Sequence, residues 1–248
     1  MSRTKIVAGN WKLNGNKALV SAFNNAFTVA KLDNVSVMIF PPALYVNEFD
    51  CEQLIIGVQN VSEQQSGAFT GELSTLMLND IGISHTLIGH SERRDLYHEN
   101  NDIIAAKVVT ALAANITPIL CIGESLDIRT AGKVNEFIQA QLDSVIDTVG
   151  MTGLSKCILA YEPIWAIGTG VTATPAQAQE VHAFIRDYLG SIDASVAQSL
   201  SILYGGSVNA KTAPDLFAQP DIDGGLVGGA SLKEEEFLTI CQAANQRG

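Results

Sequence analysis

The chain has 248 residues, of which 47% are hydrophobic and 17% charged, and its formal net charge is −11. This length suits one large globular domain or two small ones. The negative charge argues against nucleic acid or an anionic membrane as a partner, because both carry charge of the same sign. An anionic small substrate would have to be drawn by a local site against the overall field.

Segments that would direct the chain elsewhere are not evident in the sequence. No run reaches the ~18 uninterrupted apolar residues of a membrane span, and the N-terminus lacks the apolar core of a signal peptide. The four cysteines, Cys51, Cys121, Cys157 and Cys241, are widely spaced and form no Cys-x-x-Cys pair. We therefore expect free thiols and a cytoplasmic location.

Short apolar runs alternate with amphipathic stretches along the whole chain. The apolar runs predict eight strands, at residues 5–8, 35–40, 55–59, 86–88, 118–122, 158–161, 201–204 and 225–227. The stretches between them predict helices at 18–32, 101–114, 134–149, 175–189 and 234–245, with shorter segments near Tyr45, Leu76 and Leu216.

This alternation predicts an α/β fold, a parallel (β/α)8 barrel formed by a single domain over residues 1–248. No linker or low-complexity segment divides the chain. A doubly wound open sheet is the alternative, but no G-x-G-x-x-G follows the first strand. In a barrel of this kind the functional side chains gather at the carboxyl ends of the strands.

Glu162 ends the sixth predicted strand and is followed directly by Pro163. Proline biases the preceding residue toward extended backbone, so the direction of Glu162 is restricted. An apolar run with a tryptophan then leads into Gly168-Thr169-Gly170. We interpret Glu162 as a placed base and residues 163–172 as an apolar lid. The alternative is a glutamate that simply ends a strand before a turn.

Polar residues also follow the first and fourth predicted strands. Asn10 offers an amide donor and Lys12 a positive charge, although a polar turn with a surface lysine would look the same. His90 directly precedes a run that resembles the start of a short helix. Backbone N–H groups there would donate to one ring nitrogen and favour a neutral imidazole that donates from the other. The alternative for His90 is a structural role.

Paired glycines follow the seventh and eighth predicted strands, in Gly205-Gly206-Ser207 and Gly228-Gly229. Such pairs let backbone N–H groups converge on an anion, and phosphate sites recur at this place in barrels. Tight turns alone are the alternative.

Signatures of other kinds of chemistry are missing from the sequence. The histidines, at positions 85, 90, 98 and 182, have no metal-ligand spacing, and there is no G-x-S-x-G motif. We therefore expect neither metal nor cofactor, and predict proton transfer beside a carbonyl of a phosphorylated substrate.

Taken together, these motifs resemble the triosephosphate isomerase family over the whole chain and in order. The motifs that carry the resemblance are Asn10-Trp11-Lys12 and the runs at 89–94, 160–170, 204–208 and 226–231. The resemblance implies the interconversion of dihydroxyacetone phosphate and D-glyceraldehyde 3-phosphate in glycolysis and gluconeogenesis. It implies that Glu162 moves the carbon-bound proton, His90 serves the oxygens, Lys12 offsets negative charge and Asn10 donates to substrate oxygen.

The resemblance also implies which residues surround these groups. Phosphate contacts would come from Gly168, Ser207, Gly228 and Gly229, and Glu92 and Ser91 would lie beside the catalytic side chains. It further implies a homodimer, formed through the third βα loop at residues 59–72, with Thr70 reaching the neighbouring site. A long loop with exposed apolar residues needs a partner or a binding role; the alternative is a mobile surface loop.

Two other functions are compatible with such a barrel. One is an aldolase in which Lys12 forms a Schiff base with the substrate. The other is a catalytically silent protein that only binds phosphate. The presence of Glu162, His90 and Lys12 together favours the isomerase over the silent binder.

Overall fold

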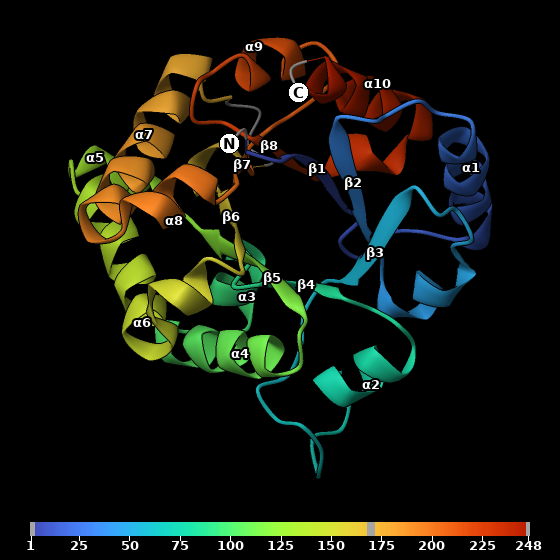
Figure 1. Cartoon of the computed structure of the whole chain (residues 1–248), viewed down its shortest axis with the longest axis horizontal. Coiled ribbons are helices and arrows are strands. Elements are labelled where there is room, and N and C mark those ends of the chain that lie inside the picture. The colour runs from blue at the N-terminus through green and yellow to red at the C-terminus, as the bar shows by residue number, and fades with distance from the viewer. Residues whose placement is uncertain (1–2, 168–171, 247–248) are drawn as a thin grey trace.

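The computed structural model describes residues 3–167 and 172–246. Its eight parallel strands pair in chain order and close into a barrel, which helices surround as an outer ring (Figure 1). The strands are β1 (Lys5–Asn10), β2 (Val35–Phe40), β3 (Leu54–Val58), β4 (His85–Ile88), β5 (Thr117–Ile122), β6 (Ile158–Tyr161), β7 (Ile202–Tyr204) and β8 (Gly224–Val227). The predicted barrel is confirmed, and the open doubly wound sheet is wrong.

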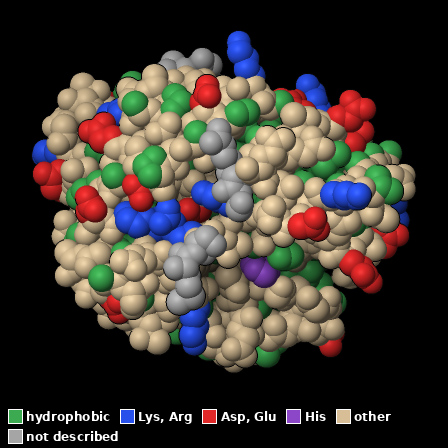
Figure 2. All heavy atoms as spheres, turned by 45° about the horizontal axis from the view of Figure 1, so that its top comes forward, with side chains coloured by type: hydrophobic (Ala, Val, Ile, Leu, Met, Phe, Trp, Pro, Cys, Tyr) green, Lys and Arg blue, Asp and Glu red, His purple; other side chains and the backbone are tan. Residues whose placement is uncertain are grey.

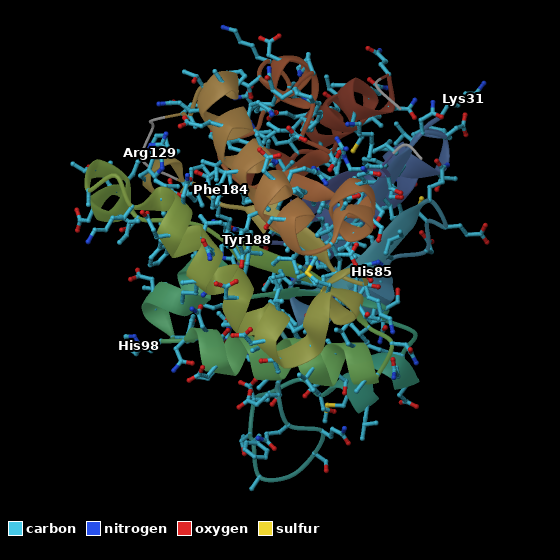
Figure 3. The ribbon with its side chains drawn as sticks, turned by 60° about the vertical axis from the view of Figure 1, so that its left-hand side comes forward. Lys31, His85, His98, Arg129, Phe184 and Tyr188 are labelled. Atoms are coloured by element: carbon cyan, nitrogen blue, oxygen red, sulfur yellow. The ribbon has the colours of Figure 1, made fainter. Side chains whose placement is uncertain are left out.

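Each of the five longer predicted helices is present. They are α1 (Lys17–Thr28), α4 (Asn101–Ala113), α6 (Val134–Leu154), α7 (Pro175–Ile192) and α10 (Glu234–Asn245). The shorter elements are η1 (Ala43–Glu48), α2 (Thr75–Asp80), α3 (Ser91–Leu96), α5 (Leu126–Thr130), η2 (Ile164–Ala166), α8 (Ala194–Ser199), α9 (Ala213–Phe217) and η3 (Gly229–Leu232). On the side seen in Figure 3, Phe184 and Tyr188 of α7 stack on each other, and Tyr188 donates to Asp143 of α6.

The strands are apolar on both faces because both faces are covered. One buried cluster comes from alternate strand residues; its members are Ile6, Ala8, Met38, Phe40, Leu87, Ile119, Cys121, Ile158, Ala160, Leu203 and Leu226. The residues between them, such as Val7 and Leu159, belong to a larger cluster shared with the helices. Strands covered on both faces therefore appear as continuous apolar runs rather than alternating ones.

The barrel closes where the last strand meets the first. Ile6 lies opposite Gly224 in the parallel pairing of β1 and β8. Gly224 has φ +138°, and a Cβ atom there would lie 1.8 Å from the carbonyl oxygen of Ile6. A glycine is therefore required at this point of the seam.

The loop between β3 and α2 projects beyond the ring of helices (Figures 1 and 3). Phe69 in this loop is 47% exposed, and Thr70 is exposed as well. None of the described helices has the length and apolarity needed to cross a bilayer.

Candidate active site

A cavity of about 450 Å³ opens at the carboxyl edge of the barrel. The connections after β1, β4, β6, β7 and β8 all contribute to its wall. Among the predicted site residues, it is lined by Asn10, Lys12, His90, Glu162, Ser207, Gly228 and Gly229. Gly168 lies outside the described residues, as does the part of the predicted lid at 168–171. Thr70 does not line the cavity of its own chain.

Glu162 is held by contacts to both its backbone and its side chain. Its N–H donates to the carbonyl of Ile122 at the end of β5 (2.7 Å). Its Oε1 lies 3.0 Å from His90 Nε2, and its Oε2 accepts the Ser91 N–H at 2.9 Å. The residue is only 2% exposed, so these contacts replace the water that would otherwise surround the carboxylate.

The proximity of Glu162 and His90 changes the pKa of each group. Burial alone would raise the pKa of Glu162, but His90 and the Ser91 N–H lower it by more, and the pKa lies below its ordinary value. Burial alone would lower the pKa of His90, but the Glu162 carboxylate raises it by more. In this arrangement the pair therefore favours an ionised carboxylate and draws a proton toward the imidazole.

His90 directly precedes α3 and caps its N-terminus. The N–H of Glu92 donates to His90 Nδ1 at 3.2 Å, which is the hydrogen bond predicted from the sequence. An Nδ1 that accepts carries no proton, so the ring proton of the neutral form lies on Nε2. This contact favours the neutral imidazole, whereas the Glu162 carboxylate opposes it; the neutrality of His90 stays a prediction.

Asn10 is the last residue of β1, and Lys12 lies on the connection that follows. Lys12 has φ +53°; its N–H donates to Asn10 Oδ1 (3.0 Å), and its carbonyl accepts from Gln59 Nε2 (2.8 Å). The Lys12 ammonium forms an ion pair with Glu92 Oε1 at 2.6 Å. These contacts hold the lysine in an uncommon backbone conformation beside the cavity.

The two predicted glycine pairs have different surroundings. A Cβ at Gly229 would meet nothing within 4 Å, and one at Gly228 would lie 3.7 Å from the Lys12 side chain. Gly205 instead leaves room for the Glu162 side chain, since a Cβ there would lie 2.9 Å from Glu162 Cγ. Gly206 leaves room for the Tyr204 hydroxyl, which a Cβ would approach to 2.2 Å. Close packing therefore explains the glycines after β7 at least as well as anion binding does.

Glu124 is a polar residue of this edge that the sequence reasoning did not single out. It is completely buried, and its Oε1 accepts from the Tyr161 hydroxyl (3.1 Å), Trp165 Nε1 (2.8 Å) and Arg129 (3.2 Å). The available signal was its position after the fifth strand, which matches that of Glu162 after the sixth. Arg94 was also missed, and its contacts are described below.

Within residues 3–167 and 172–246, no three His, Cys, Asp or Glu side chains are placed to share one metal ion. The groups around the cavity are a carboxylate, an imidazole, an ammonium, an amide and backbone N–H groups. Acidic and basic side chains are interspersed on the face seen in Figure 2, so attraction of an anion falls to the local groups.

Fold and site together define a (β/α)8-barrel enzyme that moves protons on a small anionic substrate. A family model described as triosephosphate isomerase matches residues 5–244. Proteins named triosephosphate isomerase from Xanthomonas euvesicatoria pv. vesicatoria (strain 85-10) and Pseudoalteromonas translucida (strain TAC 125) are 51% and 48% identical to the chain, over 98% of each sequence. One from Vesicomyosocius okutanii is 49% identical over 98% of this chain and 100% of its own.

The chain belongs to the triosephosphate isomerase family. It is accordingly an isomerase, with the activity that gives the family its name.

Proposed function

We propose that the cavity at the carboxyl edge interconverts dihydroxyacetone phosphate and D-glyceraldehyde 3-phosphate, as a step of glycolysis and gluconeogenesis, without a cofactor. The observation that supports this most is the buried Glu162 carboxylate, 3.0 Å from His90 on the wall of a 450 Å³ cavity. Glu162 removes the proton from the carbon beside the carbonyl and returns it to the neighbouring carbon. The electron pair left behind passes to the carbonyl oxygen, which forms an enediolate.

His90, Lys12 and Asn10 act on the substrate oxygens. His90 donates from Nε2 and moves protons between the two oxygens of the enediolate. The Lys12 ammonium offsets the negative charge of the intermediate and the phosphate, and Asn10 donates from its amide. Lys12 Nζ is engaged in an ion pair with Glu92, whereas a Schiff-base aldolase requires an amine that is free to attack a carbonyl.

The phosphate group of the substrate binds at the opposite wall. Gly228, beside the Lys12 side chain, and Gly229, which faces open space, contribute backbone N–H groups together with Ser207. Gly168 is proposed to join them, and residues 163–172 to cover the phosphate. A cover of this kind excludes water and retains the enediolate, which would otherwise expel phosphate.

Substrate binding has to release Glu162 from its present contacts. Both groups that hold the carboxylate, His90 Nε2 and the Ser91 N–H, lie at the start of α3. Because His90 Nε2 is also the proposed donor to the substrate, the carboxylate and the substrate oxygen compete for it. The resting contact therefore keeps Glu162 ionised until the substrate takes over the imidazole.

A homodimer is proposed on the distribution of exposed apolar side chains. Large exposed ones follow each of the first four strands, and they are Leu13, Leu44, Phe69, Leu96 and Tyr97. Their place in four successive connections after strands puts them on one side of the carboxyl edge, where a second copy can cover them. In this dimer the loop between β3 and α2 docks beside Asn10 and Lys12 of the other copy, and Thr70 contacts that site. Sedimentation that shows an active monomer at assay concentration would contradict this.

The remaining proposals concern the whole chain. We propose that residues 1–248 form one barrel domain and that the protein acts in the cytoplasm, without a nucleic acid or membrane partner. The net charge of −11 supports the exclusion of both anionic partners. Fractionation of cells and a gel-shift assay at low salt test these two points.

A coupled isomerisation assay of the parent chain and Glu162→Asp tests the function. Aspartate keeps the charge but withdraws the carboxylate by about one methylene, and a displacement of ~1 Å can lower the rate by ~100-fold. We expect kcat to fall by about this factor with little change in KM. Equal kcat in both proteins would remove Glu162 from the chemistry. His90→Gln, measured in the same assay, tests whether the imidazole takes part in the chemistry.

A further inference from the structure

Arg94 uses all three nitrogens of its guanidinium to join separate parts of the site. It lies in α3, four residues after His90. Its Nε donates to the carbonyl of Gly89 (2.8 Å), one terminal nitrogen to the carbonyl of Cys121 (2.9 Å), and the other to Asn101 Oδ1 (2.8 Å). Gly89 directly follows β4, Cys121 lies in β5 and Asn101 is the first residue of α4. A rigid planar fork of this kind fixes the mutual geometry of its acceptors.

One acceptor directly precedes His90 in the chain, and another directly precedes a residue that binds the Glu162 backbone. The Gly89 carbonyl forms the peptide bond that leads into His90, at a bend where Gly89 has φ +75°. Cys121 precedes Ile122, whose carbonyl accepts the N–H of Glu162 (2.7 Å). Arg94 therefore connects β5, which positions the Glu162 backbone, to the bend at Gly89, which positions the His90 imidazole.

These contacts connect Glu162 and His90 by two routes. One route runs from the Glu162 backbone through β5 to Arg94 and from Arg94 to the Gly89 carbonyl before His90. The other is the direct contact of 3.0 Å between the His90 imidazole and the Glu162 carboxylate. Without the guanidinium, β4 and β5 would still pair, Leu87 with Ile119 and Ile88 with Leu120. The bend after β4 would then be free to tilt, and the distance between imidazole and carboxylate would no longer be fixed.

We propose that Arg94 is a positioning residue of this enzyme, which fixes the place of the His90 imidazole relative to the backbone that carries Glu162 and does not itself contact the substrate. The proposal rests on the roles proposed above for His90 and Glu162. Burial lowers the pKa of Arg94, whereas the negative charge of Glu162 acts to raise it.

The central test compares Arg94→Lys with Arg186→Lys. Both replace a guanidinium that donates to several buried acceptors by a single ammonium, and Arg186 lies at the opposite end of the barrel. For Arg94→Lys we expect a fall in kcat of ~100-fold with KM changed by less than about threefold, as for a ~1 Å displacement of a catalytic group. For Arg186→Lys we expect a lower melting temperature with kcat unchanged.

Two further readouts separate positioning from folding. The imidazole NMR signals of His90 should shift in Arg94→Lys and not in Arg186→Lys. In Arg94→Ala, added guanidinium ion, well below unfolding concentrations, should restore part of kcat, whereas methylammonium should not. Unshifted His90 signals with an unchanged kcat would overturn the proposal.

Asn101→Ala provides a second test of the proposal if the Arg94 variants do not fold. This change removes one acceptor of the guanidinium at a partly exposed position. We expect kcat to fall several-fold with the melting temperature near that of the parent; an unchanged kcat would overturn the proposal. If Glu162→Asp and His90→Gln also retain full kcat, the proposed function fails instead, so the two failures are distinguishable.

Discussion

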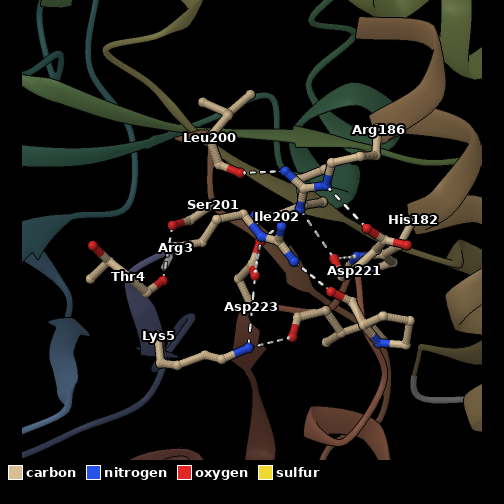
Figure 4. Close-up of polar contacts among 12 residues, drawn as sticks. Arg3, Thr4, Lys5, His182, Arg186, Leu200, Ser201, Ile202, Asp221 and Asp223 are labelled. Carbon is tan, nitrogen blue, oxygen red and sulfur yellow. Dashed lines mark hydrogen bonds and ion pairs between the residues drawn. The ribbon is translucent and has the colours of Figure 1, made fainter. Parts of the chain in front are cut away.

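The two ends of the barrel use the same kinds of side chain to different effect. At the amino end, the fully buried Asp223 is surrounded by Arg3 Nε (2.7 Å), Lys5 Nζ (3.8 Å) and a terminal nitrogen of Arg186 (2.8 Å), and it also accepts the N–H of Ile202 (2.9 Å) (Figure 4). Its charge is thus balanced within the protein. This end joins β1, β7, β8 and α7 into one network.

At the carboxyl end, the charged groups border a cavity instead. Glu162 and His90 are paired with each other, and in the proposed mechanism the substrate separates them. Lys12 and Glu92 form an ion pair that is partly exposed. The comparison indicates that charged groups at the amino end stabilise the fold, whereas those at the carboxyl end are available for chemistry. This division is possible because the two ends of parallel strands are chemically distinct. The predictions below test this division.

The largest effect is expected from removing the charge of Asp223. Asp223→Asn leaves Arg3, Lys5 and Arg186 without their shared buried counter-charge, and breaking such a pair costs about 3–5 kcal/mol. Urea denaturation should show this loss of unfolding free energy, while kcat and KM stay as in the parent. The control is Asp221→Asn, at a partly exposed ion pair with Arg186, which should cost about 1 kcal/mol or less. A fall in kcat without a fall in stability would contradict the division.

His182 should make the amino-end network sensitive to acid. It is completely buried and donates from Nδ1 to the carbonyl of Asp221 (3.1 Å), and burial lowers its pKa to about 4. Between pH ~6.5 and ~4 the unfolded chain binds a proton there that the folded chain does not. Stability should therefore fall as the pH falls through this window, by on the order of 3 kcal/mol from this group.

The measurement is the free energy of unfolding as a function of pH for the parent and His182→Gln. The variant should lose less stability between pH 6.5 and 4 than the parent does. His98→Gln is the control, because His98 is exposed at the outer edge of the molecule (Figure 3). Parallel curves for the parent and His182→Gln would exclude His182 as the cause.

At the carboxyl end, Gly205→Ala should lower activity more than stability. The added methyl group would lie 2.9 Å from Glu162 Cγ and push the base aside. We expect kcat to fall by about 10- to 100-fold, in line with a displacement below ~1 Å. Gly190→Ala in α7 is the matched control, because its methyl group would approach nothing closer than 3.7 Å. A parent-like kcat in Gly205→Ala would show that the base tolerates the contact.

The smallest effect concerns the charge state of His90. Glu162→Gln removes the carboxylate that raises the pKa of His90, while burial, which lowers that pKa, remains. The pKa of the imidazole should therefore fall, as measured by NMR titration of parent and variant. Glu92→Gln should lower it less, because Glu92 lies farther from the ring, at 3.8 Å. An imidazole pKa that is the same in parent and Glu162→Gln would mean that the two groups are not coupled.

The fold could be predicted because each strand is a separate apolar run. All eight strands begin and end within two residues of their predicted limits. Helix limits were less certain: α1 ends at Thr28 rather than near residue 32, and α6 continues to Leu154 across Gly150, which has a non-helical φ of +67°. The helices α5 and α8 were missed, because five or six residues are too few to show a helical period.

A site residue could be predicted from the sequence only where its position at the end of a strand was enough to place it. Asn10 ends a strand, and His90, Glu162 and Ser207 each follow one, so the barrel alone brings them to one edge. The role of Arg94 depends on acceptors at Gly89, Cys121 and Asn101, and that of Gly205 on contact with Glu162. Such contacts join residues up to tens of positions apart, and no local pattern in the sequence reports them.

The seam between β1 and β8 has a consequence for how the protein is made. Ile6 pairs with Gly224, and Arg3 binds Asp223. The first strand therefore cannot form these contacts until nearly the whole chain has been synthesised. Until β8 emerges, the nascent chain exposes the unpaired edges of β1 and β7, and such edges invite pairing with other chains. Chaperones that shield open strand edges should therefore matter most for the last stretch of synthesis.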